Sequence, residues 1–90
     1  MIRIAIIGMG LIGTSLGMAL RTADAQTSAL GPVQIVGYDQ EQSATRAARG
    51  RLAIDQAARS PAEALQGTQL VIIATPDQAV RALLTQLAPL

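Results

Sequence analysis

The chain has 90 residues, and its 7 basic and 6 acidic residues leave a formal net charge of +1. A near-neutral chain with a single aromatic residue, Tyr38, lacks the basic surface and the stacking rings that nucleic-acid binding needs. Cysteine and histidine are absent, which excludes disulfides, thiolate or imidazole catalysis and the usual zinc ligands, so we predict no metal site. Glycines interrupt the apolar N-terminal stretch, which argues against a signal peptide or a membrane span. We therefore expect one small cytoplasmic domain without nucleic-acid or membrane partners.

The first half of the chain predicts a strand, a helix and a second strand. Ile2–Ile7 is apolar and β-branched, as a strand buried on both faces of a parallel sheet would be. The apolar spacing then changes to that of a helix over Leu11–Arg21. Small and polar residues over Thr22–Pro32 predict a surface connection, and Val33–Tyr38 predicts the second strand.

Capping patterns mark the helices of the second half. Asp39–Gln42 has the spacing of a capping box and predicts a helix that opens there and stops at Gly50. Leu52–Ile54 is a candidate edge strand. Ser60–Glu63 is a second capping box, with proline at the first helical position, and predicts a brief helix to about Gln66.

A further strand and a last helix complete the pattern. Leu70–Ala74 predicts a buried strand, and Thr75–Gln78 predicts the cap of a helix. Strands that alternate with helices imply a parallel sheet with right-handed crossovers, helices on both faces and strand order 3-2-1-4. This is the first half of a doubly wound, Rossmann-type domain, so we assign residues 1–90 to the N-terminal part of a single such domain. The apolar side of the last predicted helix carries Val80, Leu83, Leu84 and Leu87.

A glycine-rich motif lies between the first predicted strand and helix. Residues 8–13 read G-M-G-L-I-G and match the dinucleotide fingerprint G-x-G-x-x-G. The first glycine would permit a tight turn, the second would leave the backbone open to a pyrophosphate, and the third would let the helix lie close to the sheet. The alternative is a glycine-rich turn in another α/β domain. We predict a cofactor site formed by Gly8, Met9, Gly10, Leu11, Ile12 and Gly13, with the phosphates at the helix N-terminus.

Asp39 ends the second predicted strand, where Rossmann domains place the acid that binds the adenosine ribose hydroxyls. A carboxylate has two oxygens, so Asp39 can do this and still cap a helix. It would repel a 2′-phosphate, and Gln40 stands where an NADP enzyme would offer arginine, so NAD is favoured over NADP. Further along, Ala74, Thr75 and Pro76 are expected to line the cofactor crevice at the end of their strand. We interpret four arginines as solvated surface charges without a function: Arg46, Arg49, Arg51 and Arg59.

Four segments together resemble the N-terminal region of prephenate dehydrogenases, and the resemblance covers nearly the whole chain. They read IIGMGLIGTSLG at 6–17, VGYD at 36–39, GRLAIDQA at 50–57 and VIIATP at 71–76. The resemblance implies an enzyme of tyrosine biosynthesis that oxidises and decarboxylates prephenate to 4-hydroxyphenylpyruvate with NAD. It implies pyrophosphate contacts at Gly8, Gly10 and Gly13, a ribose contact at Asp39, and a loop beside the cofactor at Thr75 and Pro76.

In that family a histidine that accepts from the substrate hydroxyl, an arginine for the substrate carboxylate and a helical dimerisation domain lie further along the chain. None of them is present in these 90 residues, so we expect this segment alone to be inactive and its parent protein to be a homodimer. Three alternatives stay open. They are an arogenate dehydrogenase, another NAD(P)-dependent dehydrogenase or reductase of the same fold, and a non-catalytic NAD-binding module.

Overall fold

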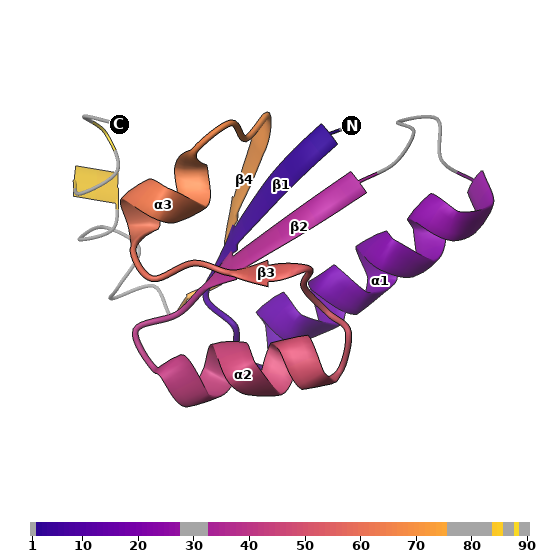
Figure 1. Cartoon of the computed structure of the whole chain (residues 1–90), viewed down its shortest axis with the longest axis horizontal. Helices are drawn as coiled ribbons and strands as arrows, with labels where there is room; N and C mark the ends of the chain where they lie inside the picture. Colours follow the sequence, from indigo (N-terminus) through magenta and orange to yellow (C-terminus); the bar gives the residue numbers. More distant parts are fainter. Residues whose placement is uncertain (1, 28–32, 76–83, 86–87, 89–90) are drawn as a thin grey trace.

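A computed structural model describes residues 2–27, 33–75, 84–85 and 88. Figure 1 shows a four-stranded sheet in the order β3-β2-β1-β4, and all three strand pairings are parallel. The predicted Rossmann-type sheet and its strand order are confirmed. The elements are β1 (Ile2–Ile7), α1 (Leu11–Thr27), β2 (Val33–Tyr38), α2 (Gln42–Gly50), β3 (Gln56–Ala57), α3 (Pro61–Leu65) and β4 (Leu70–Ile73).

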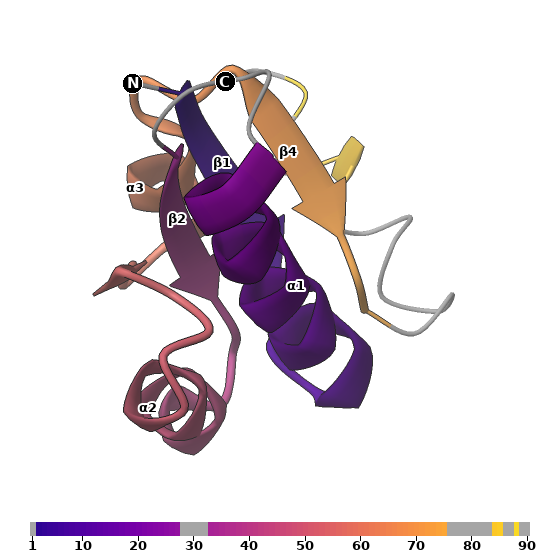
Figure 2. The same cartoon turned by 90° about the vertical axis from the view of Figure 1, so that its right-hand side faces the viewer.

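The central strand β1 buries side chains on both faces of the sheet, which explains why its run is apolar except for Arg3 near its start. Ile4 and Ile6 pack on the face that α1 and α2 cover, whereas Ala5 and Ile7 pack on the face that α3 covers. Figure 2 shows α1 in front of the strands and α3 behind them. Helices on both faces are therefore confirmed. The larger cluster lies under α1 and α2 and contains Ile4, Ile6, Met9, Ile35, Ala48, Ala53 and Ile54.

Helix α1 is longer than predicted, because it continues past Arg21 to Thr27. Alanine and glutamine in this stretch are strong helix formers, and the sequence contains neither glycine nor proline between Gly17 and Gly31. The prediction of a surface connection from Thr22 was therefore wrong for its first six residues. The remainder of that connection, 28–32, lies outside the described residues.

Helix α2 begins at Gln42 rather than at the predicted capping box. Its N-cap is Glu41, which makes no side-chain capping bond. The carboxylate of Asp39 instead accepts the N–H of Glu41, two residues further on, at 2.8 Å. Aspartate makes this local bond in turns, where it competes with capping.

Helix α2 ends at Gly50, as predicted, but the residue in the left-handed conformation is Leu52, with φ of 62°. The N–H of Leu52 donates to the carbonyl of Arg49 at 3.0 Å, and the N–H of Ala53 donates to that of Ala48 at 2.9 Å. These two bonds form a Schellman motif with leucine at the position that glycine usually occupies. The predicted edge strand over Leu52–Ile54 was wrong, because this turn occupies its start and β3 forms instead at Gln56–Ala57.

Replacing Leu52 by glycine should stabilise the protein. The side chain is 68% exposed, so little burial is lost, and the strain of a left-handed leucine is removed. We expect Leu52→Gly to raise the free energy of unfolding by about 1 kcal/mol, measured by urea denaturation. Leu52→Ala keeps the Cβ that causes the strain and should not gain. Equal stability of the two variants would contradict this explanation.

The short helix α3 confirms Ser60 as an N-cap and Pro61 at the first helical position, which is one half of the predicted capping box. The hydroxyl oxygen of Ser60 accepts the N–H of Glu63 at 3.1 Å, and Pro61 occupies the first helical position. Of the predicted last helix, the described residues Leu84 and Thr85 are helical, and the rest lies outside the described residues. Within the described parts of the chain, no helix has both the length and the apolar character that a membrane crossing requires.

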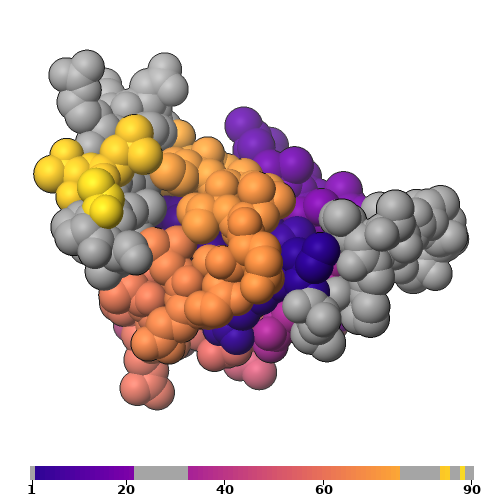
Figure 3. Space-filling view, turned by 90° about the horizontal axis from the view of Figure 1, so that it is seen from above, coloured from indigo at the N-terminus to yellow at the C-terminus, as the bar shows by residue number. Residues whose placement is uncertain are grey.

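Strand β4 lies at one edge of the sheet, and its predicted bounds were right to within one residue. The prediction that it is buried was wrong, because an edge strand has a neighbouring strand on one side only. Leu70 and Val71 are exposed there. Figure 3 shows this orange segment at the surface, next to indigo β1. The carboxyl ends of β1, β2 and β4 therefore meet at one edge of the sheet, where the predicted site residues follow each strand.

Candidate nucleotide-binding site

Gly8 begins the loop between β1 and α1, and two features require glycine there. Its φ is +105°, which L side chains rarely adopt. A Cβ added to it would also lie 2.8 Å from the carbonyl carbon of Ala74 and from Cγ2 of Thr75. The Gly8 N–H donates to the carbonyl of Tyr38 at 2.7 Å. Gly8 thus joins the ends of three neighbouring strands.

The two glycines within α1, Gly13 and Gly17, lie where the helix closely approaches other backbone segments. A Cβ on Gly13 would lie 1.9 Å from the carbonyl oxygen of Gly8. We predicted that this glycine would bring the helix close to the sheet, and the tightest contact is instead with the loop itself. One turn further, a Cβ on Gly17 would lie 2.3 Å from the carbonyl oxygen of Ala53, the last residue of the Schellman motif. The first turn of α1 is therefore held firmly against the loop.

Gly10 differs from these glycines, because a Cβ added to it would meet no atom within 4 Å. Packing within the described chain does not require glycine at this position. The following residues, Leu11 and Ile12, are 81% and 68% exposed and form the first turn of α1. Backbone N–H groups in the first turn of a helix have no acceptor within the helix. An anion can approach open backbone and unpaired donors at this point.

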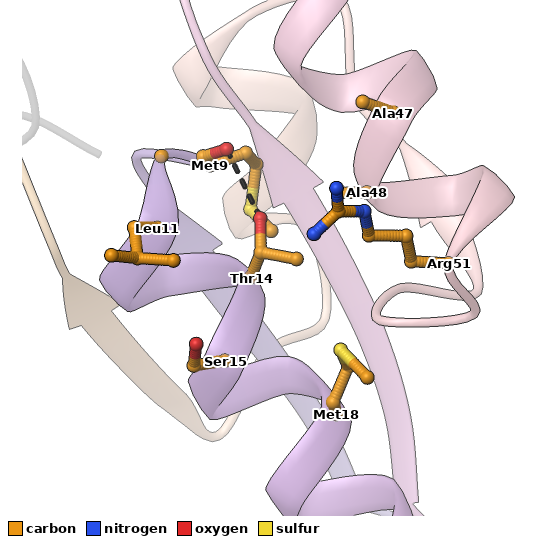
Figure 4. A pocket seen from close by; sticks show the side chains of 9 residues that line it. Met9, Leu11, Thr14, Ser15, Met18, Ala47, Ala48 and Arg51 are labelled. Atoms are coloured by element: carbon orange, nitrogen blue, oxygen red, sulfur yellow. Dashed lines mark hydrogen bonds between the residues drawn. The ribbon is translucent and has the colours of Figure 1, made fainter.

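Met9 shapes the loop through its backbone. The residue is only 3% exposed and belongs to the core cluster under α1 and α2. Its N–H donates to Oδ2 of Asp39 at 2.8 Å, and its carbonyl accepts the hydroxyl of Thr14 at 3.1 Å (Figure 4). Both backbone groups are therefore in use, so a phosphate would find its donors at the residues after Met9.

Asp39 lies beside the glycine loop, so the structure brings these two predicted site segments together. One carboxylate oxygen accepts the N–H of Met9, and the other accepts the N–H of Glu41. A carboxylate can accept about four hydrogen bonds, so about two acceptor positions remain for sugar hydroxyls. The structure thus leaves Asp39 able to bind a ribose.

The segment after β4 closes the other side of the loop. The Ala74 N–H donates to the carbonyl of Ile7 at 2.8 Å, which continues the sheet by one residue. The hydroxyl oxygen of Thr75 is buried and has no hydrogen-bond partner among the residues that the structure describes. Unpaired buried hydroxyls are uncommon in folded proteins, and a ligand is one way to satisfy them. Pro76, the third predicted residue of this segment, lies outside the described residues.

Thr75→Val tests whether that hydroxyl serves a ligand. The substitution keeps the shape of the side chain and removes an unpaired buried oxygen, so we expect the free energy of unfolding to stay equal or to rise by about 1 kcal/mol. Binding of NAD should weaken roughly fivefold if the hydroxyl contacts the cofactor. Thermal denaturation and calorimetric titration measure the two effects. Unchanged affinity would exclude Thr75 from the site.

One groove adjoins the loop, and a second lies beside Asp39. The first has a volume of about 180 Å³ and lies between α1 and α2, where the Arg51 side chain extends toward Thr14 (Figure 4). The second has a volume of about 490 Å³, lies beside Asp39 and is lined by Arg46, Arg49 and Arg59.

The three arginines of the second groove form no ion pair within the described part of the chain. We interpreted them as solvated surface charge without a function, and the structure places them around one groove. The spacing of Arg46 and Arg49 on one side of a helix was a usable signal. The sequence did not predict that Arg59, on the segment after β3, lies beside the same groove.

Comparisons with known proteins agree with this geometry. The structure of arogenate dehydrogenase from Synechocystis is similar, with a TM-score of 0.81 and 28% identity over 98% of this chain. The chain spans 28% of the length of that protein. No protein with a curated description matches the sequence. The similarity confirms the predicted resemblance to prephenate and arogenate dehydrogenases. Residues 3–90 match the model of a family described as NADP oxidoreductase, coenzyme F420-dependent, and the chain belongs to this family.

Proposed function

We propose that the chain is the NAD-binding segment of a dehydrogenase that oxidises and decarboxylates prephenate to 4-hydroxyphenylpyruvate. The observation that carries the proposal is the open backbone at Gly10, between the carboxylate of Asp39 and the exposed first turn of α1. When bound, NAD supplies the acceptor for the hydride that leaves the substrate. The residues of this chain bind and orient that cofactor.

Each part of the cofactor has a matching group on the chain. The N–H groups at the start of α1 would bind the pyrophosphate, because that end of the helix carries partial positive charge. The free acceptor positions of Asp39 would bind the adenosine ribose hydroxyls. The hydroxyl of Thr75 would contact the cofactor from the β4 side. Replacing Asp39 with alanine should weaken NAD binding by roughly 1.5–3 kcal/mol, the size of a hydrogen bond to a charged group.

Substrate recognition lies outside this segment in our proposal. The chain contains no histidine, so the acceptor for the substrate hydroxyl must come from elsewhere in the parent protein. The homodimer, its helical dimerisation domain and the cytoplasmic location stay predictions. The assignment of 1–90 to the N-terminal part of one nucleotide-binding domain is part of the proposal.

Arogenate is the second candidate substrate, and the similarity to an arogenate dehydrogenase favours it. The test is NADH formation by the full-length parent protein with prephenate and with arogenate, compared as kcat/KM. A higher value for prephenate supports the proposal, and a higher value for arogenate replaces the substrate. If NAD binds and neither substrate is oxidised, another dehydrogenase of this fold or a non-catalytic module is the correct assignment.

NADP is the second candidate cofactor. The family description and the three arginines beside Asp39 favour it, whereas the carboxylate of Asp39 and the absence of arginine at Gln40 favour NAD. We expect NAD to bind at least roughly tenfold more tightly than NADP, a difference of about 1.4 kcal/mol. The Arg46→Gln variant distinguishes the two cofactors. If the 2′-phosphate of NADP binds in the groove, this substitution should weaken the binding of NADP and leave the binding of NAD unchanged.

A further inference from the structure

We propose that Asp39 is also a positioning residue that fixes the glycine-rich loop for the cofactor phosphates. This inference rests on the proposed function and adds a second role to the sugar contact. Its basis is the pair of bonds at the Asp39 carboxylate, where Oδ2 accepts the N–H of Met9 and Oδ1 accepts the N–H of Glu41, each at 2.8 Å. One side chain therefore connects the loop before α1 to the segment before α2.

The loop is attached to the end of β2 through two consecutive N–H groups. That of Gly8 donates to the backbone carbonyl of Tyr38 at 2.7 Å, and that of Met9 donates to the side chain of the next residue, Asp39. The first bond involves backbone atoms only and does not depend on the side chain of residue 39. The second depends on the carboxylate, and without it the N–H of a residue that is 3% exposed loses its partner.

The residue that follows these attachments is Gly10, whose backbone is open to a ligand. The hydrogen bonds at the Met9 backbone determine the direction of the Gly10 peptide groups and of the first turn of α1. The hydroxyl of Thr14 holds the Met9 carbonyl, while Asp39 holds the N–H. Removing the carboxylate breaks the bond at the Met9 N–H, so the N–H donors for the pyrophosphate lose part of their preorganisation.

The two roles of Asp39 predict opposite results for a ligand that lacks the ribose hydroxyls. If Asp39 only bound the sugar, its loss would leave the affinity for such a ligand equal or would raise it, because a negative charge near the pyrophosphate would be removed. If Asp39 positions the loop, its loss weakens the same ligand although the ligand never contacts the carboxylate.

The experiment uses calorimetric titration with two probes, NAD and an NAD analogue whose adenosine ribose lacks both the 2′- and 3′-hydroxyls. We expect Asp39→Ala to weaken NAD binding at least roughly tenfold and analogue binding roughly fivefold. Asp39→Asn keeps one uncharged acceptor oxygen, so we expect it to restore much of the affinity for the analogue. Equal or tighter binding of the analogue by Asp39→Ala would overturn the positioning role and leave the sugar contact intact.

Asp55→Ala is the matched control for Asp39→Ala. The Asp55 carboxylate also connects separate elements, since it accepts the N–H of Ile35 at 2.7 Å and pairs with Arg21, but it makes no contact with the loop. We expect this variant to lower stability without changing the affinity for either probe. A comparable loss of affinity for the analogue in this control would mean that general destabilisation explains the result.

Amide hydrogen exchange at Met9 provides a measurement that needs no ligand. We expect faster exchange in Asp39→Ala than in wild type, with protection recovered in Asp39→Asn. If wild type bound neither probe, the proposed cofactor function would fail, and the exchange rates would still decide whether Asp39 fixes the loop. Unchanged exchange in Asp39→Ala would refute the positioning role.

Discussion

Gly13→Ala should abolish or severely weaken folding. The added Cβ would lie 1.9 Å from the carbonyl oxygen of Gly8 and 3.0 Å from its carbonyl carbon. Both are backbone atoms, so no side chain can rotate away to make room. We expect a loss of at least about 3 kcal/mol, at the upper end of what overpacking costs and a large share of the stability of a small domain. Urea denaturation followed by circular dichroism measures it.

A second glycine provides the control for Gly13. Gly50 is the last residue of α2, and a Cβ there would meet no atom within 4 Å. Gly50→Ala should therefore be neutral or should stabilise the helix by up to about 1 kcal/mol. If both alanine variants behaved alike, the close approach of α1 to the loop would not be a determinant of stability.

Gly10→Ala should separate binding from folding. Nothing in the described chain lies near the added methyl group, so we expect the free energy of unfolding to change by less than about 1 kcal/mol. The methyl would occupy space through which the pyrophosphate reaches the backbone. We expect NAD binding to weaken by roughly 10- to 100-fold, which corresponds to about 1–3 kcal/mol of steric cost.

Calorimetric titration and thermal denaturation of the same Gly10→Ala sample measure both quantities. Gly50→Ala is again a suitable control, because it adds the same methyl group at a distance from the loop. Tight NAD binding by a folded Gly10→Ala protein would contradict the placement of the pyrophosphate at this residue.

The sheet was predictable because its signals are local and strong. β1 and β2 have the predicted bounds, since both are rich in β-branched residues and the sequence pattern changes at each end. The short helix after Ser60 was predictable for a similar reason, because a serine cap and a proline at the next residue act within one turn.

The features that the sequence did not reveal depend on contacts between distant segments. The spacing from Asp39 to Gln42 fitted a helix cap, and nothing local showed that the N–H of Met9 would occupy that carboxylate. The left-handed Leu52 was also hidden, because glycine two residues earlier offered the more usual stop. Ala53 and Ile54 are buried in the core under α1 and α2, and their apolar character resembled that of a strand.

The central place of β1 also determines when the site forms during folding. Ile2 lies opposite Val33, and Ile4 lies opposite Leu70, so both pairings of β1 close long stretches of chain. Such pairings cost chain entropy before their contacts form. The junction of Gly8 with Ala74 needs both, so we expect the loop to reach its final shape late in folding. If a nucleotide binds there as proposed, it should slow unfolding and leave the folding rate unchanged.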